Sequence, residues 1–170
     1  MFEINDIVMY KFVVCKIKES FTRSETKEKY FSLRPIFDPS SEILIPMSNL
    51  SSNMRNLITP EKANELFDMF ESLEIIDKPT KFIESEYRKA IVSTQPEDLL
   101  KVIKTTKCRI QEKSNLHLRR NEKDAQYLSR CEEYLYPEIA VSLGITIDEV
   151  SERFNLLMDR WYSTHQQPNS

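Results

Sequence analysis

Side chains that commonly carry out catalysis or bind metals are few and scattered in this sequence. His117 and His165 are its two histidines, and neither has a cysteine or carboxylate at the spacing of a metal site or a catalytic triad. Adjacent glutamates such as Glu132 and Glu133 point in different directions on a helix and do not form an acid/base pair. A phosphate-binding loop is rich in glycine, whereas the chain has one glycine, Gly144. The sequence therefore predicts a protein that is not an enzyme and that uses no cofactor, metal or small-molecule substrate.

The composition favours a folded protein with no general attraction to nucleic acid. Hydrophobic residues make up 40% of the 170 residues and the formal net charge is −3, so any contact with DNA has to come from a local basic patch. Cys15, Cys108 and Cys131 lack the short spacing of zinc or redox motifs, which predicts reduced, packed thiols. The first residues do not resemble a leader, and no apolar run is long enough to span a membrane. We expect a soluble, cytoplasmic protein that does not bind membranes.

The clearest structural signal is a helix that begins after Asn121. Asn121 can cap this helix, and Asp124 stands where a side chain can bond back to the cap. Apolar residues then recur at helical spacing up to Leu143, and Gly144 follows as a residue suited to end a helix in the left-handed conformation. Pro137 predicts a kink within this helix.

Threonines mark the expected starts of four further helices. They are Thr59, followed by a proline, Thr80, Thr94 and Thr146. Thr94 and Thr146 each have a glutamate three residues later, Glu97 and Glu149, which is the pattern of a capping box. Together with the helix after Asn121, these signals predict five helices.

Segments with strand character fill the N-terminal third. They are rich in β-branched and aromatic residues and lie at 7–10, 12–18, 29–34 and 43–45. Short strands this close together suggest a small barrel or a strongly bent sheet. We place the change from strands to helices within 48–59. The sequence thus predicts an α+β fold with a small antiparallel β domain over 1–50, a five-helix domain over 59–162 and a loose tail over 163–170.

Several short motifs also follow one another in a recognisable order. They are MFEINDIVMY at the start, Tyr30–Arg34, Ile43–Pro46, the helix start Thr59–Ala63 and Glu138–Ile145. In this order they resemble the CarD/CdnL family of bacterial transcription regulators, over nearly the whole chain. The resemblance implies a Tudor-like β domain that binds the β subunit of RNA polymerase. It also implies a helical domain that contacts promoter DNA, commonly with a tryptophan wedged into the minor groove.

The resemblance places two segments against the polymerase. They are Glu19, Ser20, Phe21, Thr22 and Arg23, and the strand Ile43, Leu44 and Ile45. An exposed strand edge recruits a partner strand through main-chain hydrogen bonds, a mode that tolerates side-chain changes. Two features depart from the family, because its basic residue before the Val-Pro pair is Leu44 here and its proline-glycine loop is shortened to Lys11-Phe12. An altered contact, a different partner, or a role for Leu44 and Ile45 in filling the barrel all stay open.

The positions that the resemblance assigns to DNA depart further from the family. The tryptophan position is Ile83, next to Phe82, and the basic pair that usually follows reads Ser85-Glu86. Phe82 and Ile83 suit either a minor-groove wedge or the core. Candidate phosphate contacts are Arg88, Lys89, Arg119, Arg120, Lys123 and Arg130. Such charges also occur on solvated helix faces.

Two functions of different classes fit these observations. The first is a non-enzymatic regulator that binds RNA polymerase through the β domain and modulates initiation, with promoter DNA as a second partner. The alternative is a protein–protein adaptor on the same scaffold without DNA binding, because fold does not determine function. A continuous positive stripe over Arg88 and Arg130 favours the regulator, whereas an acidic face with an exposed apolar patch favours the adaptor.

Overall fold

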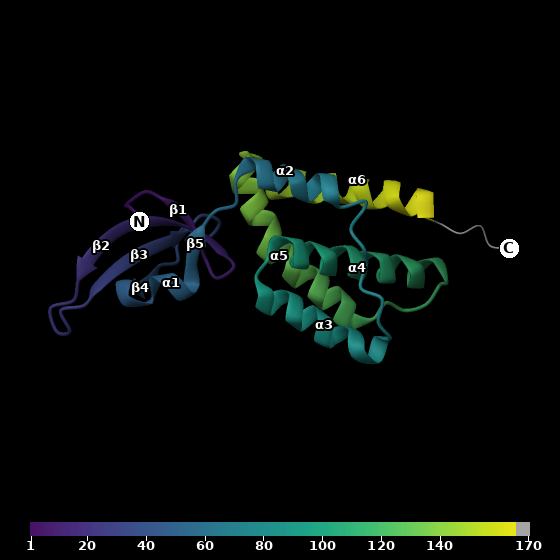
Figure 1. Ribbon diagram of the computed structural model, residues 1–170, viewed down its shortest axis with the longest axis horizontal. Coiled ribbons are helices and arrows are strands. Elements are labelled where there is room, and N and C mark those ends of the chain that lie inside the picture. The colour runs from purple at the N-terminus through teal and green to yellow at the C-terminus, as the bar shows by residue number, and fades with distance from the viewer. Residues whose placement is uncertain (166–170) are drawn as a thin grey trace. The chain divides into compact units, whose positions relative to one another are not determined.

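Strands and helices occupy separate parts of the chain in the computed structural model, which describes residues 1–165 except for the side chain of Ser51 (Figure 1). The first unit is Met1–Ile58 and the second begins at Thr59. An antiparallel sheet forms the first unit and helices form most of the second, so the predicted α+β class is confirmed. Within the described chain, no helix combines the length and the apolar character that crossing a membrane requires.

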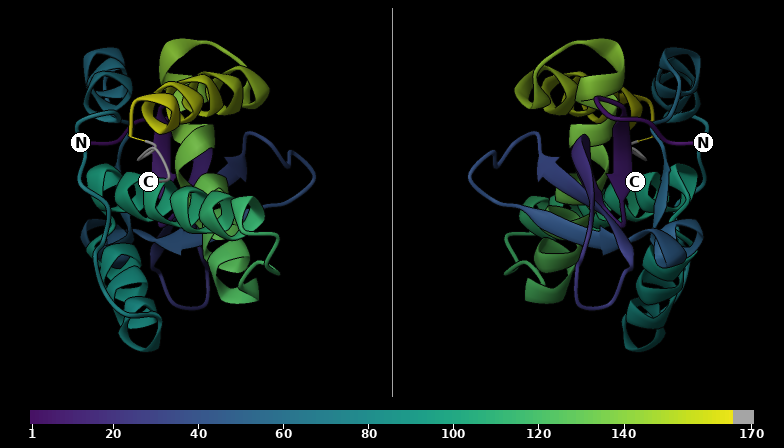
Figure 2. Two further views of the ribbon diagram at one scale, coloured as in Figure 1. Left: turned by 90° about the vertical axis from the view of Figure 1, so that its right-hand side faces the viewer. Right: turned by 90° about the vertical axis from the view of Figure 1, so that its left-hand side faces the viewer.

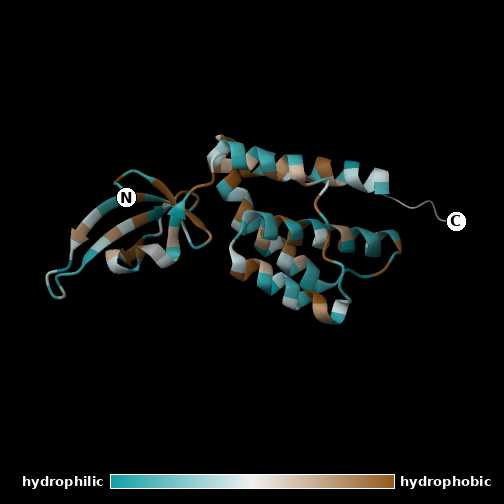
Figure 3. Ribbon diagram, viewed as in Figure 1, coloured by the Kyte–Doolittle hydropathy of each residue, from teal (hydrophilic) through white to brown (hydrophobic). Residues whose placement is uncertain are grey.

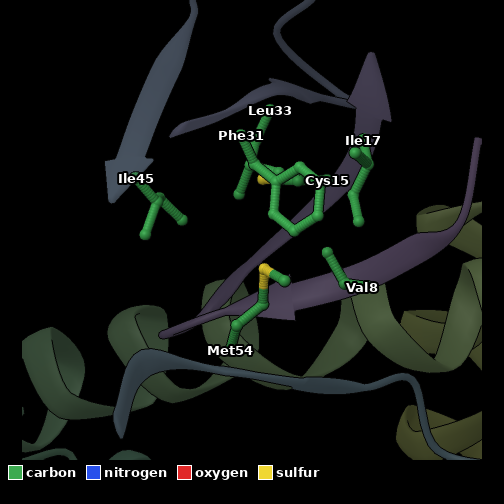
Figure 4. Packing of buried hydrophobic residues seen from close by; sticks show 7 residues of the cluster. All are labelled: Val8, Cys15, Ile17, Phe31, Leu33, Ile45 and Met54. Atoms are coloured by element: carbon green, nitrogen blue, oxygen red, sulfur yellow. The ribbon is translucent and has the colours of Figure 1, made fainter. Parts of the chain in front are cut away.

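The first unit is one sheet of five antiparallel strands. They are β1 (Ile7–Tyr10), β2 (Val13–Thr22), β3 (Lys29–Pro35), β4 (Ile43–Pro46) and β5 (Met54–Asn56), in the order β4-β3-β2-β1-β5. A 3-10 turn, η1 (Met47–Asn49), and one helical turn, α1 (Leu50–Asn53), connect β4 to β5. The strands enclose a small core, shown in Figure 4, that consists of Val8, Cys15, Ile17, Phe31, Leu33, Ile45 and Met54.

Two strands of this sheet differ from the sequence prediction. β2 continues through Thr22, past its predicted end at residue 18, because β3 pairs with it along the whole hairpin down to Lys29. β5 was not predicted, since three residues carry little local strand signal and its partner β1 is distant in the sequence. The first unit therefore extends past residue 50 to Ile58.

The second unit contains the five predicted helices. They are α2 (Pro60–Met69), α3 (Thr80–Ser93), α4 (Pro96–Asn115), α5 (Glu122–Leu143) and α6 (Ile147–His165). α4 crosses α5 in both views of Figure 2 and packs against it. Figure 3 shows apolar residues recurring between hydrophilic ones along α2 and α6, the pattern of helices that bury one face.

Several predicted helix ends are confirmed. The hydroxyl of Thr59 accepts a hydrogen bond from the N–H of Lys62, and Gly144 ends α5 with a left-handed φ of 66°. The capping box of α6 is reciprocal. The Thr146 N–H donates to the Glu149 carboxylate (2.8 Å), and the Glu149 N–H donates to the Thr146 hydroxyl (3.0 Å). These ends form as predicted because each depends on residues within one turn.

Two predicted caps are wrong. Thr94 adopts a left-handed φ of 58° and ends α3 instead of opening α4, because Pro96 takes the first position of α4. Asp124 does not bond back to the cap of α5. It is buried and binds Tyr87 and Arg109, so a tertiary contact replaces the local one.

The C-terminal helix extends farther than predicted. Residues 163–165 are helical rather than part of a loose tail, and the rest of the predicted tail, 166–170, lies outside the described residues. The hydroxyl of Ser163 bonds to the carbonyl of Arg160 (2.8 Å), and the His165 ring stacks on Trp161 with centroids 4.6 Å apart. Pro137, where the sequence predicts a kink, lies inside α5.

A buried lysine holds the end of α2 against α4. Lys104 is 1% exposed, and its ammonium donates to the carbonyls of Phe70 (2.8 Å), Glu71 (3.0 Å) and Leu73 (2.6 Å). It also lies 4.7 Å from the centre of the Trp161 ring. Carbonyls at the end of a helix lack intrahelical donors and carry partial negative charge. Burial lowers the pKa of Lys104, and the neighbouring Glu71 carboxylate opposes this shift.

Replacing Lys104 with methionine removes the donor that these three carbonyls share. We expect Lys104→Met to lower the free energy of unfolding of the helical unit by roughly 2–4 kcal/mol. Urea unfolding followed by the fluorescence of Trp161, the sole tryptophan, measures this change. Lys101→Met, on the same helix and partly exposed, is the control and should change the free energy by less than about 0.5 kcal/mol. Equal stability of wild type and Lys104→Met would contradict the role assigned to Lys104.

Candidate functional site

One extra residue in β2 determines which of its side chains face outward. Ile17 lies opposite Leu33 of β3, but the next pair is Glu19 with Ser32, so Lys18 forms a β-bulge. Side chains alternate between the two faces of a strand, and a bulge reverses that alternation. Glu19 therefore lies on the outer face of the sheet, opposite the core.

Past the bulge, aromatic side chains line up on the outer face. Phe21 lies opposite Tyr30, and Tyr30 lies opposite Pro46 of β4. The rings of Phe21 and Tyr30 stack with centroids 5.7 Å apart, and the guanidinium of Arg23 lies 4.7 Å from the centre of the Tyr30 ring. Phe21, Tyr30 and Pro46 thus form an apolar row across three strands, which we call the aromatic row.

β4 is an edge strand that pairs only with β3 among the strands of the described chain. Leu44 is 41% exposed on the outer face, whereas Ile45 is 2% exposed in the core. Ile45 therefore fills the interior, and Leu44 does not. The N–H and C=O groups of alternate residues in an edge strand point away from the neighbouring strand and are open to another one.

The structure brings part of each segment predicted to face the polymerase onto one surface. Glu19 and Leu44 both flank Ser32 of β3, and Phe21 belongs to the aromatic row that ends on β4. Ser20 and Ile45 are the exceptions, because Ser20 pairs with Phe31 on the inner face and Ile45 is buried in the core. The remaining predicted residues stay accessible: Thr22 and Arg23 are exposed and Ile43 is partly exposed.

The two predicted DNA wedges have opposite environments. Ile83 is 3% exposed and lies in the helical core, so it cannot reach DNA without unpacking that core. Phe82 is 56% exposed, and the ammonium of Lys81 lies 5.6 Å from the centre of its ring. A place in the core is therefore correct for Ile83 but not for Phe82. Phe82 is the one remaining candidate for a minor-groove wedge.

Three predicted basic residues meet around Tyr127. Arg88 donates to the Tyr127 hydroxyl (3.3 Å), and the guanidinium of Arg130 lies 5.3 Å from the centre of the Tyr127 ring. Glu84 accepts hydrogen bonds from Arg88 (2.9 Å), from the Tyr127 hydroxyl (3.2 Å) and from Lys123. The bond from Lys123 lowers the pKa of Glu84. We call Glu84, Arg88, Lys123, Tyr127 and Arg130 the Tyr127 cluster.

The other basic candidates lie elsewhere on the helical unit. Lys89 pairs with Glu86 (3.2 Å) and Arg120 with Glu122 (3.5 Å), while Arg119 is exposed. A carboxylate beside a basic side chain weakens its attraction to phosphate. The described surface around Arg88 and Arg130 is therefore not a continuous positive stripe, since Glu84 lies within it.

A buried carboxylate positions the Tyr127 cluster. Asp124 of α5 accepts hydrogen bonds from the Tyr87 hydroxyl of α3 (2.9 Å) and from Arg109 of α4 (3.0 Å). Burial raises the pKa of Tyr87, so its hydroxyl remains a donor. The rings of Tyr87 and Tyr127 pack with centroids 5.1 Å apart. This network holds α3 against α5, where the cluster lies.

Sequence reasoning missed the acidic members of both networks. Glu84 and Arg88 are four residues apart, the spacing of an ion pair on a helix, and this signal could have been read from the sequence. Asp124 and Tyr87 come from different helices, and no local pattern joins them.

The models of known protein families show no match to this chain, and neither do the curated proteins. In the part of the chain described here, no group of three or more histidine, cysteine, aspartate or glutamate side chains is arranged to hold a metal ion.

The three thiols are free and buried, as the sequence predicts. Burial raises the pKa of Cys15 and Cys108 to about 11 and that of Cys131 to about 12, from 9.0. The unfolded chain loses these protons near pH 9.0, whereas the folded chain holds them to higher pH. The thiol contribution to stability is therefore complete below that pH and is lost as pH rises toward 11 for Cys15 and Cys108 and toward 12 for Cys131.

These thiols should react slowly while the protein is folded. The thiolate is the reactive form, and we expect a disulfide reagent at pH ~8 to label the native chain roughly a hundredfold more slowly than the chain in denaturant. Absorbance of the released reagent measures both rates. Rapid native labelling of Cys15, Cys108 or Cys131 would contradict their burial.

Proposed function

We propose that this chain is a non-enzymatic regulator of bacterial transcription. In this proposal the first unit binds the β subunit of RNA polymerase and the protein modulates initiation in the cytoplasm. The observation that carries the proposal is the edge of β4 that no other strand of residues 1–165 pairs with, on which Leu44 is exposed. An edge strand of this kind binds partners by adding a strand to the sheet.

The strand order supports a Tudor/SH3-like identity for the first unit. Antiparallel strands in the order β4-β3-β2-β1-β5, with a helical turn between β4 and β5, are the arrangement expected of an SH3-like barrel. The order of motifs that resembles the CarD/CdnL family points to the same domain and to polymerase as its partner.

DNA is the second partner in this proposal, with a reduced contact. Phe82 is the candidate wedge, and Arg88, Lys123 and Arg130 are the candidate phosphate contacts. Unstacking a base step costs a few kcal/mol, which phosphate contacts must offset. The carboxylate of Glu84 weakens these phosphate contacts, because it repels phosphate and binds Arg88 and Lys123. The ion pairs of the helical unit therefore favour the alternative, a protein–protein adaptor without DNA binding, for this unit alone.

Binding of the full chain to purified RNA polymerase core enzyme tests the main proposal. Along an antiparallel edge strand, successive N–H groups point alternately toward and away from the neighbour, and proline has none. One of the variants Ile43→Pro and Leu44→Pro should therefore remove an N–H that bonds to β3, which lowers the stability of the fold. The other variant should remove an N–H that points away from β3. It should keep the circular dichroism spectrum of the wild type and weaken polymerase binding by about tenfold or more. A wild-type chain that fails to bind the core enzyme at low salt would refute the proposal.

Removing Glu84 tests the DNA contact. Glu84→Gln releases Arg88 and Lys123 from their carboxylate, so we expect tighter binding of promoter DNA to the complex with polymerase, by about threefold to tenfold at ~50 mM salt and less at ~200 mM. Gel-shift titrations measure both affinities. Glu152→Gln, on an exposed position of α6, is the control for net charge.

The reverse change provides the second arm of that test. Replacing Arg88, Lys89 and Arg130 with glutamate should abolish the salt-dependent gel shift of promoter DNA by the complex with polymerase. If neither Glu84→Gln nor these reversals alters DNA binding, the helical unit makes no DNA contact and the adaptor alternative is favoured for it.

A further inference from the structure

The outer face of the β unit consists of rows of side chains from paired residues. The first row is Ile7, Lys16 and Arg34, the second is Glu19, Ser32 and Leu44, and the third is the aromatic row, Phe21, Tyr30 and Pro46. Side chains of directly opposed residues lie on the same face and contact each other. The first row thus carries the basic pair Lys16 and Arg34, the second carries Glu19, and the third is apolar.

Charges of both signs lie close together on this face. Buried Ser32 donates to the carboxylate of Glu42 (2.5 Å), which places Glu42 beside Leu44. The basic residues Lys16 and Arg34 lie in the row next to Glu19 and Glu42. On the other side, the guanidinium of Arg23 lies over the Tyr30 ring. A strongly acidic partner would meet the glutamates and a strongly basic one would meet the arginines. Charge complementarity on this face favours a partner surface without net charge.

Apolar residues of the second and third rows lie at the free edge itself. Leu44 and Pro46 belong to β4, and both are on the outer face. A strand added to an edge runs about 4.8 Å from it, with every second side chain on the same face. An added strand therefore sets alternate side chains directly beside Leu44 and Pro46. Pro46 has no N–H, which restricts main-chain pairing to Ile43–Ile45.

We propose that β4 binds an extended, uncharged strand of its protein partner whose alternate side chains are apolar. The identity of that partner as RNA polymerase rests on the proposed function, whereas the chemistry of the strand follows from the rows on this face. The contact is held by main-chain hydrogen bonds along Ile43–Ile45 and by burial of Leu44 and the aromatic row. It does not depend on ionic attraction.

Synthetic strand peptides test the chemistry without the polymerase. Three capped peptides alternate threonine with valine, lysine or glutamate, and their binding to the isotope-labelled full chain is followed by amide chemical shifts. The threonine–valine peptide should shift the amides of Ile43–Ile45, and the two charged peptides should not. Binding of a charged peptide that equals or exceeds that of the threonine–valine peptide would overturn the proposal.

A matched pair of variants separates this face from general surface hydrophobicity. Leu44→Arg should weaken the peptide-induced shifts at least about tenfold. Val13→Arg should leave them unchanged, since Val13 is similarly exposed, at 40% against 41%, but lies outside the three rows. Unchanged binding by Leu44→Arg would also overturn the proposal.

The polymerase experiment distinguishes this proposal from the function on which it builds. If the core enzyme binds the chain, its affinity should change by less than about threefold between ~50 mM and ~500 mM salt, and a loss above about tenfold would overturn the apolar contact. If the core enzyme does not bind but the threonine–valine peptide does, the proposed function fails and the strand chemistry stands. If neither binds, both fail.

Discussion

The β-bulge at Lys18 is the constraint on which the binding surface of the first unit depends. A regular β2 would turn Phe21 inward and Ser20 outward, because side chains alternate strictly along an unbroken strand. With the bulge, Ser20 faces a hollow of about 540 Å³ that is also lined by Phe31, Met47 and Leu50. Phe21 then stacks on Tyr30 outside. One added residue thus separates the core from the aromatic row.

The helical unit depends in a comparable way on one buried carboxylate. Asp124 is 1% exposed and receives donors from two other helices, Tyr87 of α3 and Arg109 of α4. A buried charge without such partners would be strongly destabilising, so the three helices must assemble together. Their assembly places Glu84 among Arg88 and Lys123, and this explains why a basic cluster that the sequence suggests is partly neutralised in the structure.

Local signals predicted much of the fold, and long-range pairing accounts for most of what they missed. The helices after Thr59, Asn121 and Thr146 begin where capping residues stand, because a cap involves only neighbours in the chain. The scarcity of glycine did not prevent tight turns, since Lys11 and Lys27 take left-handed φ values of 54° and 58° at the hairpins. β5 and the bulge at Lys18 depend on partner strands, and no pattern within either segment announces them.

The candidate site shows the same division. The sequence singled out the strand with Leu44 and the basic residues of α3 and α5, because residue type and order are visible in it. It could not separate Leu44 from Ile45, or Phe82 from Ile83, since exposure depends on what packs against each side chain. Which of two chemically similar neighbours is available for binding depends on which one is buried in the folded chain.

The shortness of β4 has a consequence for the behaviour of the protein at high concentration. Long, flat, apolar edge strands pair with copies of themselves and lead to fibrils, and natural proteins avoid this with short edges and prolines. β4 has four residues and ends in Pro46. The short length of β4 and its terminal proline limit strand addition by a partner to a few residues. They also prevent identical chains from pairing along a long edge and stacking into fibrils.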